Sequence, residues 1–484
     1  MVERPPRFSS LDRAPVVAVL LAAVLCVAAL QLGGAKVPDP DVFWIAAAGR
    51  DFPRLLAPPT TNGYSFVDGA VPWVFHERLF APLYAAGLSA LGPSFFSAWG
   101  ALVGIVGIAL VFGALARACE RLAVAAMATL LVLFGARSAL FQPRPAGAAL
   151  VLFIATLALA SAPWSRARAA ALLAVALVWT NAHGSFPLAA LATLAIAIDE
   201  RATRRRRLGL AVAIAALGVA TPYGLRLPVL AVRYVLGGNP TMALVHRHIL
   251  EFAPLWRAGA PLVDPLSVMA LVASAVMALS ALRSPRTRGR ALFVLLLVGL
   301  AVRQARHGGL DCVAAAMLLH GEIERLLGHA TTRPRFPARL AVSIALPAIF
   351  ALAIIWSHAR ARRDEGGWLA ANLGGRDALA LLDVVPNGAR LYVPFDLGGL
   401  VLWRAAPRGV RVFYDSRNDC YAPENARVAF AIETGAMEPR DAVDLLRARG
   451  ATHLLVADGT PIAKALGALR PLARQGAWSL VAAR

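Results

Sequence analysis

Long apolar runs separated by short clusters of arginine make up most of the first 360 residues of the chain. A helix of about 20 apolar residues crosses the hydrocarbon core of a bilayer. The runs therefore predict an α-helical polytopic membrane protein with about eleven transmembrane helices. The expected helices cover residues 15–32, 94–115, 122–136, 146–162, 169–180, 185–198, 208–221, 262–282, 291–302, 310–320 and 340–357.

The arginine clusters orient these helices, because cytoplasmic loops carry an excess of Lys and Arg. Three arginines precede the first run, and the strongest cluster lies at residues 201–207. This pattern predicts a protein that spans the membrane several times. Its N-terminus is expected in the cytoplasm, and residues 33–93 and the C-terminal tail are expected outside it. The first run is long and lacks a convincing small-residue cleavage site, so we expect a retained helix.

Composition supports the same class. Of the 484 residues, 58% are hydrophobic and 16% are charged, and the mean hydropathy is +0.63. A net charge of +21 is a feature of many nucleic-acid-binding proteins, but here the arginines lie mostly between apolar runs. The basic charge therefore orients the helices in the membrane, and we expect no nucleic-acid partner. The four cysteines are dispersed and predict no disulfide framework or metal cluster.

The pattern changes after residue 358, where short β-type runs alternate with helical stretches. The β-type runs lie at residues 390–394, 410–414, 452–457 and 477–482, and the helical stretches lie near residues 440–449 and 461–469. This alternation predicts a small α/β domain. We expect a transmembrane bundle at residues 1–360, which includes the external loop 33–93, and a soluble domain at 361–484 that folds alone. The polar segments 396–399 and 415–421 are expected to form loops and helix caps.

Two carboxylates stand directly after the first apolar run, in Asp39-Pro40-Asp41. Carboxylates near hydrocarbon cost several kcal/mol unless they are paired, hydrated or used. Asp39 and Asp41 are therefore candidate catalytic residues. The alternative is a solvated turn in which the carboxylates cap the start of a helix.

His76 and Glu77 are candidate substrate-binding residues in the same external loop. They precede apolar residues spaced as one face of an interfacial amphipathic helix. They are candidates for acceptor binding or metal ligation, but two adjacent residues without a third ligand indicate a metal only weakly.

Further candidates lie at the external ends of the later helices. Asn181 and His183 stand beside Gly184, where backbone can approach a ligand; a hydrogen bond between helices is the alternative for His183. Arg144, Arg303 and Arg306, with His307, are expected to bind a phosphate or pyrophosphate. Interfacial arginines with extended side chains are the alternative.

A series of motifs runs along nearly the whole chain. They are Asp39-Pro40-Asp41-Val42-Phe43-Trp44, Tyr64-Ser65-Phe66, Trp73-Val74-Phe75-His76-Glu77, Arg144-Pro145, Trp179-Thr180-Asn181-Ala182-His183-Gly184, Thr221-Pro222-Tyr223-Gly224, Arg306-His307, Gly398-Gly399-Leu400-Val401-Leu402-Trp403 and Asp415-Ser416-Arg417-Asn418-Asp419-Cys420-Tyr421. In this order they resemble a group of bacterial multi-spanning proteins similar to the GT-C superfamily of glycosyltransferases.

The resemblance implies a bundle of about eleven helices, an essential Asp in the first external loop and a sugar donor carried on a polyprenyl phosphate. Oligosaccharyltransferases and protein O-mannosyltransferases are distant members of this superfamily. By the same resemblance the first-loop Asp, at Asp39 or Asp41, acts as base or metal ligand. The chain departs from the pattern at Ile45, where a His is expected, and at Asn62, where an Asp is expected. These departures put metal binding in doubt and raise the prospect of an altered or lost activity.

The resulting hypothesis is a membrane glycosyltransferase that transfers a sugar from a polyprenyl-phosphate-linked donor to an extracytoplasmic acceptor. Displacement at an anomeric carbon needs a base on the acceptor and charge stabilisation for the departing phosphate. Its partners are the polyprenyl-phosphate sugar donor and membrane lipid. No cofactor is certain, and a divalent metal is possible. The alternatives are a transporter or flippase of a lipid-linked precursor and a non-catalytic membrane assembly protein.

The orientation of the chain is testable with reporter fusions. Alkaline phosphatase fused after Arg484 should be active, and the same enzyme fused after Arg206 should be inactive, because it folds only outside the cytoplasm. The reverse pattern of activity would place the carboxylate loop in the cytoplasm.

Overall fold

The structure of the chain is a computed structural model, which describes residues 39–53, 57–236, 240–257, 265–327, 373–468 and 471–483, with Val24 and Leu369. The chain forms two compact units. Unit 1 comprises Met1–Gly34, Ala98–Ala220 and Ile249–His358, and unit 2 comprises Ala35–Ser97, Thr221–His248 and Ala359–Arg484.

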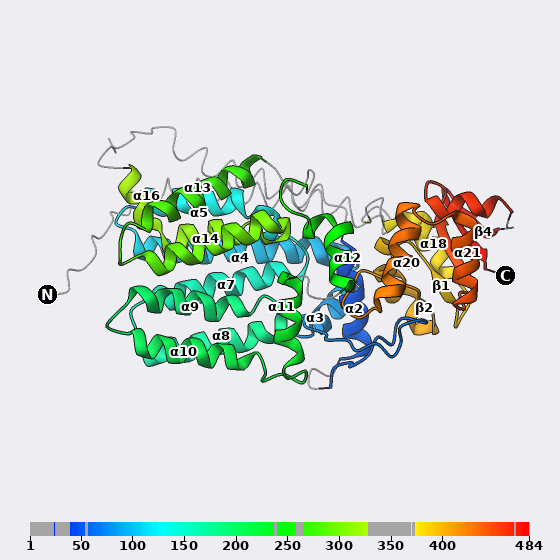
Figure 1. Ribbon diagram of the computed structural model, residues 1–484, viewed down its shortest axis with the longest axis horizontal. Helices are drawn as coiled ribbons and strands as arrows, with labels where there is room; N and C mark the ends of the chain where they lie inside the picture. The colour runs from blue at the N-terminus through cyan, green and yellow to red at the C-terminus, as the bar shows by residue number, and fades with distance from the viewer. Residues whose placement is uncertain are drawn as a thin grey trace. The chain divides into compact units, whose positions relative to one another are not determined.

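Unit 1 is helical throughout its described part. Its elements are α4 (Ser94–Ala118, which begins in unit 2), α5 (Leu122–Gly135), α6 (Arg137–Leu140), α7 (Pro145–Ser161), α8 (Arg166–Ala182), α9 (Pro187–Asp199), α10 (Arg204–Leu217), η1 (Leu250–Phe252), α13 (Pro265–Ala281), α14 (Arg288–Arg303), η2 (Ala305–His307), α15 (Leu310–Leu318) and α16 (His320–Leu327). The long helices lie side by side (Figure 1). Helix α9 packs against α7, α10 and α14, and α13 packs against α5 and α14.

The helices expected between residues 94 and 320 are all present. The largest difference in a boundary is four residues, where the expected helix 208–221 is α10, Arg204–Leu217. It begins earlier because its arginines continue the helix, for which they have a good propensity. The first and last expected helices, 15–32 and 340–357, lie outside the described residues apart from Val24. The total of eleven therefore stays a prediction.

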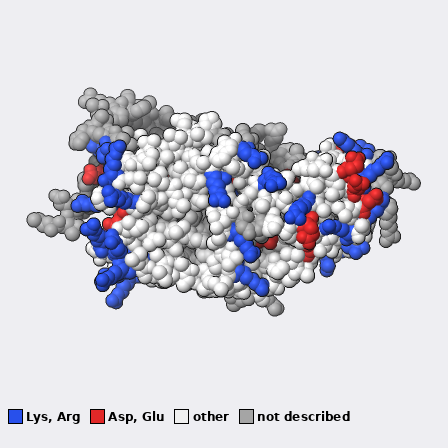
Figure 2. Space-filling view, in the orientation of Figure 1, with Lys and Arg blue, Asp and Glu red and all other residues white. Residues whose placement is uncertain are grey.

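Among the described helices, α4 is long and apolar enough to cross a membrane by length and composition. The shorter apolar helices are Ala81–Leu91, Val124–Gly135, Pro145–Ser161, Pro187–Asp199 and Pro265–Ala281. Unit 1 also exposes large apolar side chains along its helices, among them Val212, Met269 and Val272. On the face shown in Figure 2 its helices carry few charges along their length, and Lys and Arg gather at one end. A surface of this kind is typical of contact with lipid.

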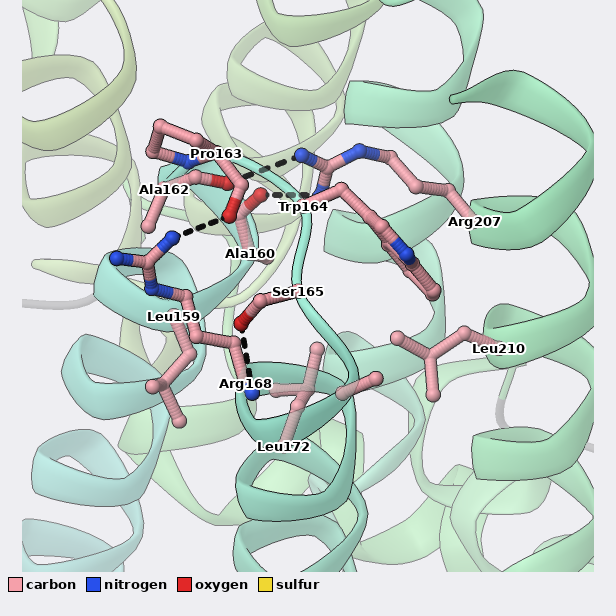
Figure 3. A pocket seen from close by; sticks show the side chains of 11 residues that line it. Leu159, Ala160, Ala162, Pro163, Trp164, Ser165, Arg168, Leu172, Arg207 and Leu210 are labelled. Carbon is pink, nitrogen blue, oxygen red and sulfur yellow. Dashed lines mark hydrogen bonds between the residues drawn. The ribbon is translucent and has the colours of Figure 1, made fainter. Parts of the chain in front are cut away.

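Hydrogen bonds hold several arginine-rich turns together at that end. Arg207 donates to the carbonyl oxygens of Ala160 and Ala162 at the end of α7 (Figure 3). The Asp199 carboxylate, after α9, accepts the backbone N–H groups of Gly289 and Arg290 at 2.6 and 3.0 Å. The clusters near residues 166, 204 and 288 thus lie at the same end of unit 1, as expected for loops on one side of the membrane.

Unit 2 combines helices with a mixed sheet. Its elements are α2 (Asp41–Asp51), α3 (Ala81–Leu91), α11 (Arg226–Leu236), α12 (Pro240–His248), α18 (Gly375–Val384), β1 (Arg390–Tyr392), η5 (Phe395–Leu397), α19 (Gly398–Ala405), η6 (Ala406–Arg408), β2 (Arg411–Val412), α20 (Pro423–Thr434), α21 (Pro439–Ala448), β3 (His453–Ala457), η7 (Pro461–Ala468), β4 (Pro471–Gln475) and β5 (Trp478–Ala482). The strand order is β2-β1-β3-β5-β4. Strand β1 pairs in parallel with β2 and β3, and β5 pairs antiparallel with β3 and β4.

The α/β character of the tail is confirmed, with strands at each of the four expected runs and helix α21 at residues 440–449. The expected helix at 461–469 is a 3₁₀ segment, η7. The pattern missed α18, α19, α20 and β4. Helix α19 begins with Gly398-Gly399, and glycine has a low helix propensity, so the sequence predicts a loop there. The helix forms nevertheless because it packs against α2.

The segment around Ser65, between α2 and α3, adds to this sheet. Ser65 pairs in parallel with Val412, and the Val412 N–H donates to the Tyr64 carbonyl at 3.0 Å. The segment therefore satisfies backbone groups at the edge of β2. The boundary at residues 360 and 361 stays a prediction, but the compact unit that holds the tail also holds residues 35–97.

A close approach of backbone joins α2 to α19. A Cβ added at Gly399 would lie 2.2 Å from the carbonyl oxygen of Pro40, which a side chain cannot occupy without a shift of backbone. At the other end of α2, Arg50 donates to the carbonyl oxygens of Leu402 and Trp403 and stacks over the Trp403 ring. The two helices are thus held together at both ends.

Replacing Gly399 should therefore destabilise unit 2. Gly399→Ala should cost about 1–3 kcal/mol of unfolding free energy, because the methyl group forces α19 away from α2. Gly63→Ala is the matched control, since nothing lies within 4 Å of its added Cβ. Thermal unfolding of the full chain in detergent measures both. Equal melting temperatures for the two variants would show that the approach is not tight.

Candidate functional site

The first-loop carboxylates stand at the start of α2. The backbone N–H of Asp41 donates to Asp39 Oδ1 at 3.0 Å, and the Trp44 indole N–H donates to Asp41 Oδ1 at 3.0 Å. Both residues are partly exposed. These contacts close a turn ahead of α2, and no side-chain hydrogen bond caps its N-cap residue, Pro40. They leave both carboxylates at the surface of unit 2, and a catalytic role stays a prediction.

Aromatic rings from the first loop surround this turn. The Trp44 ring lies 6.0 Å from Trp73 and 5.8 Å from Phe75, and Trp73 stacks on Phe75 at 4.9 Å. Tyr64 continues the group, 6.3 Å from Trp73. These side chains make a rigid apolar wall beneath the carboxylates.

A fully buried ion pair of the tail lies against this wall. Arg417 Nη2 donates to Asp415 Oδ2 at 2.7 Å and Arg417 Nε donates to Asp415 Oδ1 at 2.9 Å, and both side chains are 0% exposed. The guanidinium lies 5.0 Å from the Tyr64 ring centre and 4.8 Å from that of Trp73. Burial alone would lower the pKa of Arg417, but Asp415 raises it above its ordinary value. Arg417 therefore keeps its positive charge.

Several buried polar atoms around the segment 415–421 have no hydrogen-bond partner within the described part of the chain. They are Asn62 Oδ1, Ser416 Oγ, Arg417 Nη1 and Asp419 Oδ2. Buried polar atoms are rarely left without a partner, and such groups indicate a bound water, ion or ligand. Burial also raises the pKa of Asp419 to about 7, with smaller contributions from Asp415 and Asp41. Perturbed carboxyls of this kind gather at functional sites.

The sequence assigned this segment only to loops and caps, and so missed it. Asp415-Ser416-Arg417-Asn418-Asp419 has the composition of an exposed turn. Four of its residues are Asp, Ser or Asn, which favour turns, and the fifth is a charged Arg. Asn418 does adopt a left-handed φ of 43°. The segment is buried all the same, since the first loop covers it. The available signal was the Arg between two Asp residues directly after an apolar run.

The two departures from the superfamily pattern have structural reasons. Ile45 is fully buried in α2, where it packs as a core residue. Asn62 is also fully buried, and its Nδ2 donates to the carbonyl oxygen of Cys420 at 3.0 Å. A carboxylate has no N–H to donate, so an Asp would leave that carbonyl without its bond.

A divalent metal does not fit the residues at this site. Among the residues that the structure describes, no three His, Cys, Asp or Glu side chains are grouped so as to hold a metal ion. The carboxylate oxygens Asp39 Oδ1 and Asp41 Oδ1 each accept an N–H from α2. We therefore derive no step that involves a metal.

His76 and Glu77 lie in a turn directly before a helix, and their roles in binding stay predictions. Residues 76–80 form a turn, and α3 begins at Ala81, with Pro82 in its first turn. Proline favours a helix start, where its missing N–H costs nothing. The His76 ring lies 6.0 Å from Tyr234, and Glu77 is buried.

In unit 1 the structure brings two of the predicted arginines together. Arg144 Nη1 lies 2.9 Å from Glu251 Oε2, and Arg306 Nη1 lies 3.6 Å from Glu251 Oε1. Burial would raise the pKa of Glu251, but Arg144 and Arg306 together hold it below its ordinary value. Sequence reasoning missed Glu251, an acidic residue of η1 whose arginine partners lie more than fifty residues away along the chain.

These three residues line a cavity of about 140 Å³. Its other polar lining residues include Gln142, Ser267 and Asp311. Arg306 also stacks over the Phe252 ring, 4.2 Å from its centre. The cavity is large enough for a phosphate or sugar group, and its arginines are the side chains that hold phosphate best.

The other predicted binding residues lie outside the lining of this cavity. His307 Nε2 is 3.1 Å from Gln304 Oε1, and Arg303 is exposed at the end of α14. At the end of α8, Asn181 donates to the Leu177 carbonyl at 2.8 Å, and His183 Nδ1 is 2.8 Å from Ser185 Oγ. Their roles as substrate contacts stay predictions.

Comparison with known proteins gives matches by structure alone. A scan against protein-family models finds no match, and a search of curated proteins finds none. ArnT from Cupriavidus metallidurans, solved with bound undecaprenyl phosphate, matches with a TM-score of 0.56 and 15% identity. The match covers 97% of this chain and 98% of ArnT.

Oligosaccharyltransferase structures from Archaeoglobus fulgidus also match. The apo enzyme has a TM-score of 0.54 and 13% identity, over 93% of this chain and 70% of that chain. The complex of AglB with an inhibitory peptide and a dolichol-phosphate has a TM-score of 0.51 and 13% identity over the same shares. The chain thus shares the fold of these structures, and the resemblance predicted from its motifs is confirmed at the level of fold.

The buried ion pair should be essential to the stability of unit 2. Arg417→Gln should cost about 3–5 kcal/mol, because it leaves the Asp415 carboxylate buried without its counter-charge. The double variant Asp415→Asn, Arg417→Gln should lose less than the sum of the two single variants. Denaturant unfolding of the full chain measures these losses.

The matched control is the exposed pair Arg474 and Asp458, whose side chains are 58% and 51% exposed. Arg474→Gln should cost about 0–1 kcal/mol. Losses for Arg417→Gln no larger than for this control would mean that the buried pair does not hold the loops together.

Proposed function

We propose that this chain is a membrane glycosyltransferase that moves a sugar from a polyprenyl-phosphate-linked donor to an extracytoplasmic acceptor. It would act in the bacterial inner membrane, with a cytoplasmic N-terminus and an extracytoplasmic C-terminal domain. The observation that carries the proposal is the match in fold to ArnT over nearly the full length of both chains, since that structure holds undecaprenyl phosphate. The AglB complex with a dolichol-phosphate supports the same donor class.

The arginine cavity of unit 1 supports a place for the donor phosphate. Arg144 and Arg306 share one carboxylate, Glu251, so a phosphate would compete with that carboxylate for both guanidinium groups. Such a phosphate carries charge on several oxygens and offers bidentate geometry to each arginine. The polyprenyl chain would lie in lipid beside the exposed apolar helices. Arg303 and His307, near the same helix end, would extend the contact with the donor.

The carboxylates of unit 2 support a role at the acceptor. Inverting displacement at an anomeric carbon requires a group that takes the acceptor proton, and a carboxylate supplies it. Asp39 and Asp41, at the start of α2, are our candidates for this part of the reaction. His76 and Glu77 in the same unit, and Asn181 and His183 in unit 1, are the proposed contacts to sugar and acceptor hydroxyls.

Proteoliposomes that contain the purified chain and radiolabelled polyprenyl-phosphate sugars test this function. Asp39→Asn or Asp41→Asn should lower turnover about 100-fold or more if the carboxylate is the base. Helix capping alone predicts little change, because Asn caps about as well as Asp. Arg144→Gln should raise KM for the donor, and Arg257→Gln, in an exposed turn of unit 1, is the matched control.

The same assay separates the alternatives. Movement of the labelled lipid across the bilayer without sugar transfer would favour a flippase. The absence of both transfer and movement would favour an assembly protein and contradict the proposal.

A further inference from the structure

Asp419 is a carboxyl that the tail holds at the same site as Asp41. Its Oδ2 atom is buried and has no hydrogen-bond partner among the described residues. The negative charge of Asp41, in α2, contributes to raising the pKa of Asp419. The charge of Asp419 in turn contributes to raising the pKa of Tyr223, in the segment that follows Thr221. Three separate segments of unit 2 thus converge on one carboxyl group.

The loop that carries Asp419 is rigid. Tyr414 donates its hydroxyl to Asn418 Oδ1 at 3.1 Å, and Asn418 Nδ2 donates to the Ser416 carbonyl at 2.8 Å. Arg417 is fixed by Asp415 on one side and by two aromatic rings on the other. A group held in this way needs no rearrangement to meet a substrate.

The charged and titratable groups around Asp419 set its protonation. Asp415 and Asp41 raise its pKa, in addition to burial, while Arg417 and a backbone hydrogen bond lower it. Cys420, Tyr414 and Tyr223 are also near, and burial raises the pKa of each above its ordinary value. They therefore stay neutral, and Asp419 exchanges its proton near neutral pH with a pKa of about 7.

We propose that Asp419, in place of Asp39 or Asp41, accepts the proton of the acceptor nucleophile, in a site that it shares with Asp41. The inference rests on the proposed transferase function and assigns a residue of the tail to the chemistry. In this step the acceptor O–H bond breaks and its proton passes to Asp419 Oδ2. The freed oxygen bonds to the anomeric carbon, and the bond from that carbon to the donor phosphate breaks, with both electrons leaving on the polyprenyl phosphate.

The geometry distinguishes Asp419 from the first-loop carboxylates. Asp39 Oδ1 and Asp41 Oδ1 each accept an N–H that belongs to the start of α2. Asp419 Oδ2 accepts none from the described chain. Asp41 then positions the acceptor and keeps Asp419 basic through its negative charge, because a like charge disfavours a second carboxylate nearby.

The pH dependence of transfer tests this role. Only the ionised carboxylate accepts a proton, so wild-type kcat should fall about tenfold for each pH unit below about 7. Asp419→Asn should lower kcat about 100-fold or more and remove this slope. Asp419→Glu should keep the dependence of kcat on pH at a reduced rate. This variant shows whether the loss in Asp419→Asn comes from the missing carboxylate or from misfolding. Asp441→Asn, with the same change of charge at an exposed position of α21, is the matched control.

Two measurements report on Asp419 without any turnover. Dicyclohexylcarbodiimide modifies protonated carboxyls, so peptide mapping of the labelled full chain should find Asp419 modified at pH 6 and spared at pH 8. The folded pKa lies above the unfolded value of about 3.9, so ionisation costs stability as the pH rises towards 7. Asp419→Asn should therefore melt higher than wild type at pH 8 and about equally at pH 4.

The outcomes separate the two proposals. Wild-type transfer with an unchanged rate and pH profile in Asp419→Asn would overturn the role of Asp419 and leave the transferase standing. Modification of Asp419 that does not change between pH 6 and 8 would also overturn it. A wild-type chain that transfers no sugar would overturn both.

Discussion

The buried guanidinium of Arg417 is the group on which the arrangement of unit 2 depends. An isolated charge inside a protein costs many kcal/mol, so it must be enclosed by a counter-ion and by polarisable surfaces. The tail supplies the counter-ion, Asp415, and the first loop supplies the rings of Tyr64 and Trp73. The loop and the tail are far apart in sequence, and the charge becomes stable only when both are in place. The same contact brings the start of α2 to the segment that holds Asp419.

The charge of Arg417 is compensated differently from that of the pair Arg144 and Arg306. Arg417 has a carboxylate of its own and is sealed from solvent, which suits a group that holds structure. Arg144 and Arg306 share the single carboxylate of Glu251 and keep 19% and 23% of their side chains exposed at a cavity. Two positive charges that share one carboxylate keep a net attraction for a further anion, whereas an arginine with a carboxylate of its own does not. This difference is the physical reason for placing the phosphate at Arg144 and Arg306.

The departures from the superfamily pattern describe a site of altered polarity. Ile45 makes the interior of α2 apolar, and Asn62 trades a carboxylate for an amide that supports Cys420. Both changes remove potential metal ligands. The polar groups that remain lie on the tail segment, where Arg417 and Asp419 present atoms without partners in the described structure. Charge at this site therefore comes from the tail as well as from the first loop.

Apolar periodicity determined the long described helices of unit 1 and four of the five described strands of the tail, because the pattern is local and repeats along the chain. Motif order also indicated the GT-C fold. Local pattern misassigned α19, whose two glycines are explained only by the approach of Gly398 to Asp415 and of Gly399 to Pro40. The pairing of Arg144 with Glu251 and the burial of Arg417 were likewise beyond the sequence. Charge and exposure at these positions depend on segments brought together from distant parts of the chain, so only the tertiary structure decided which polar residues became buried and reactive.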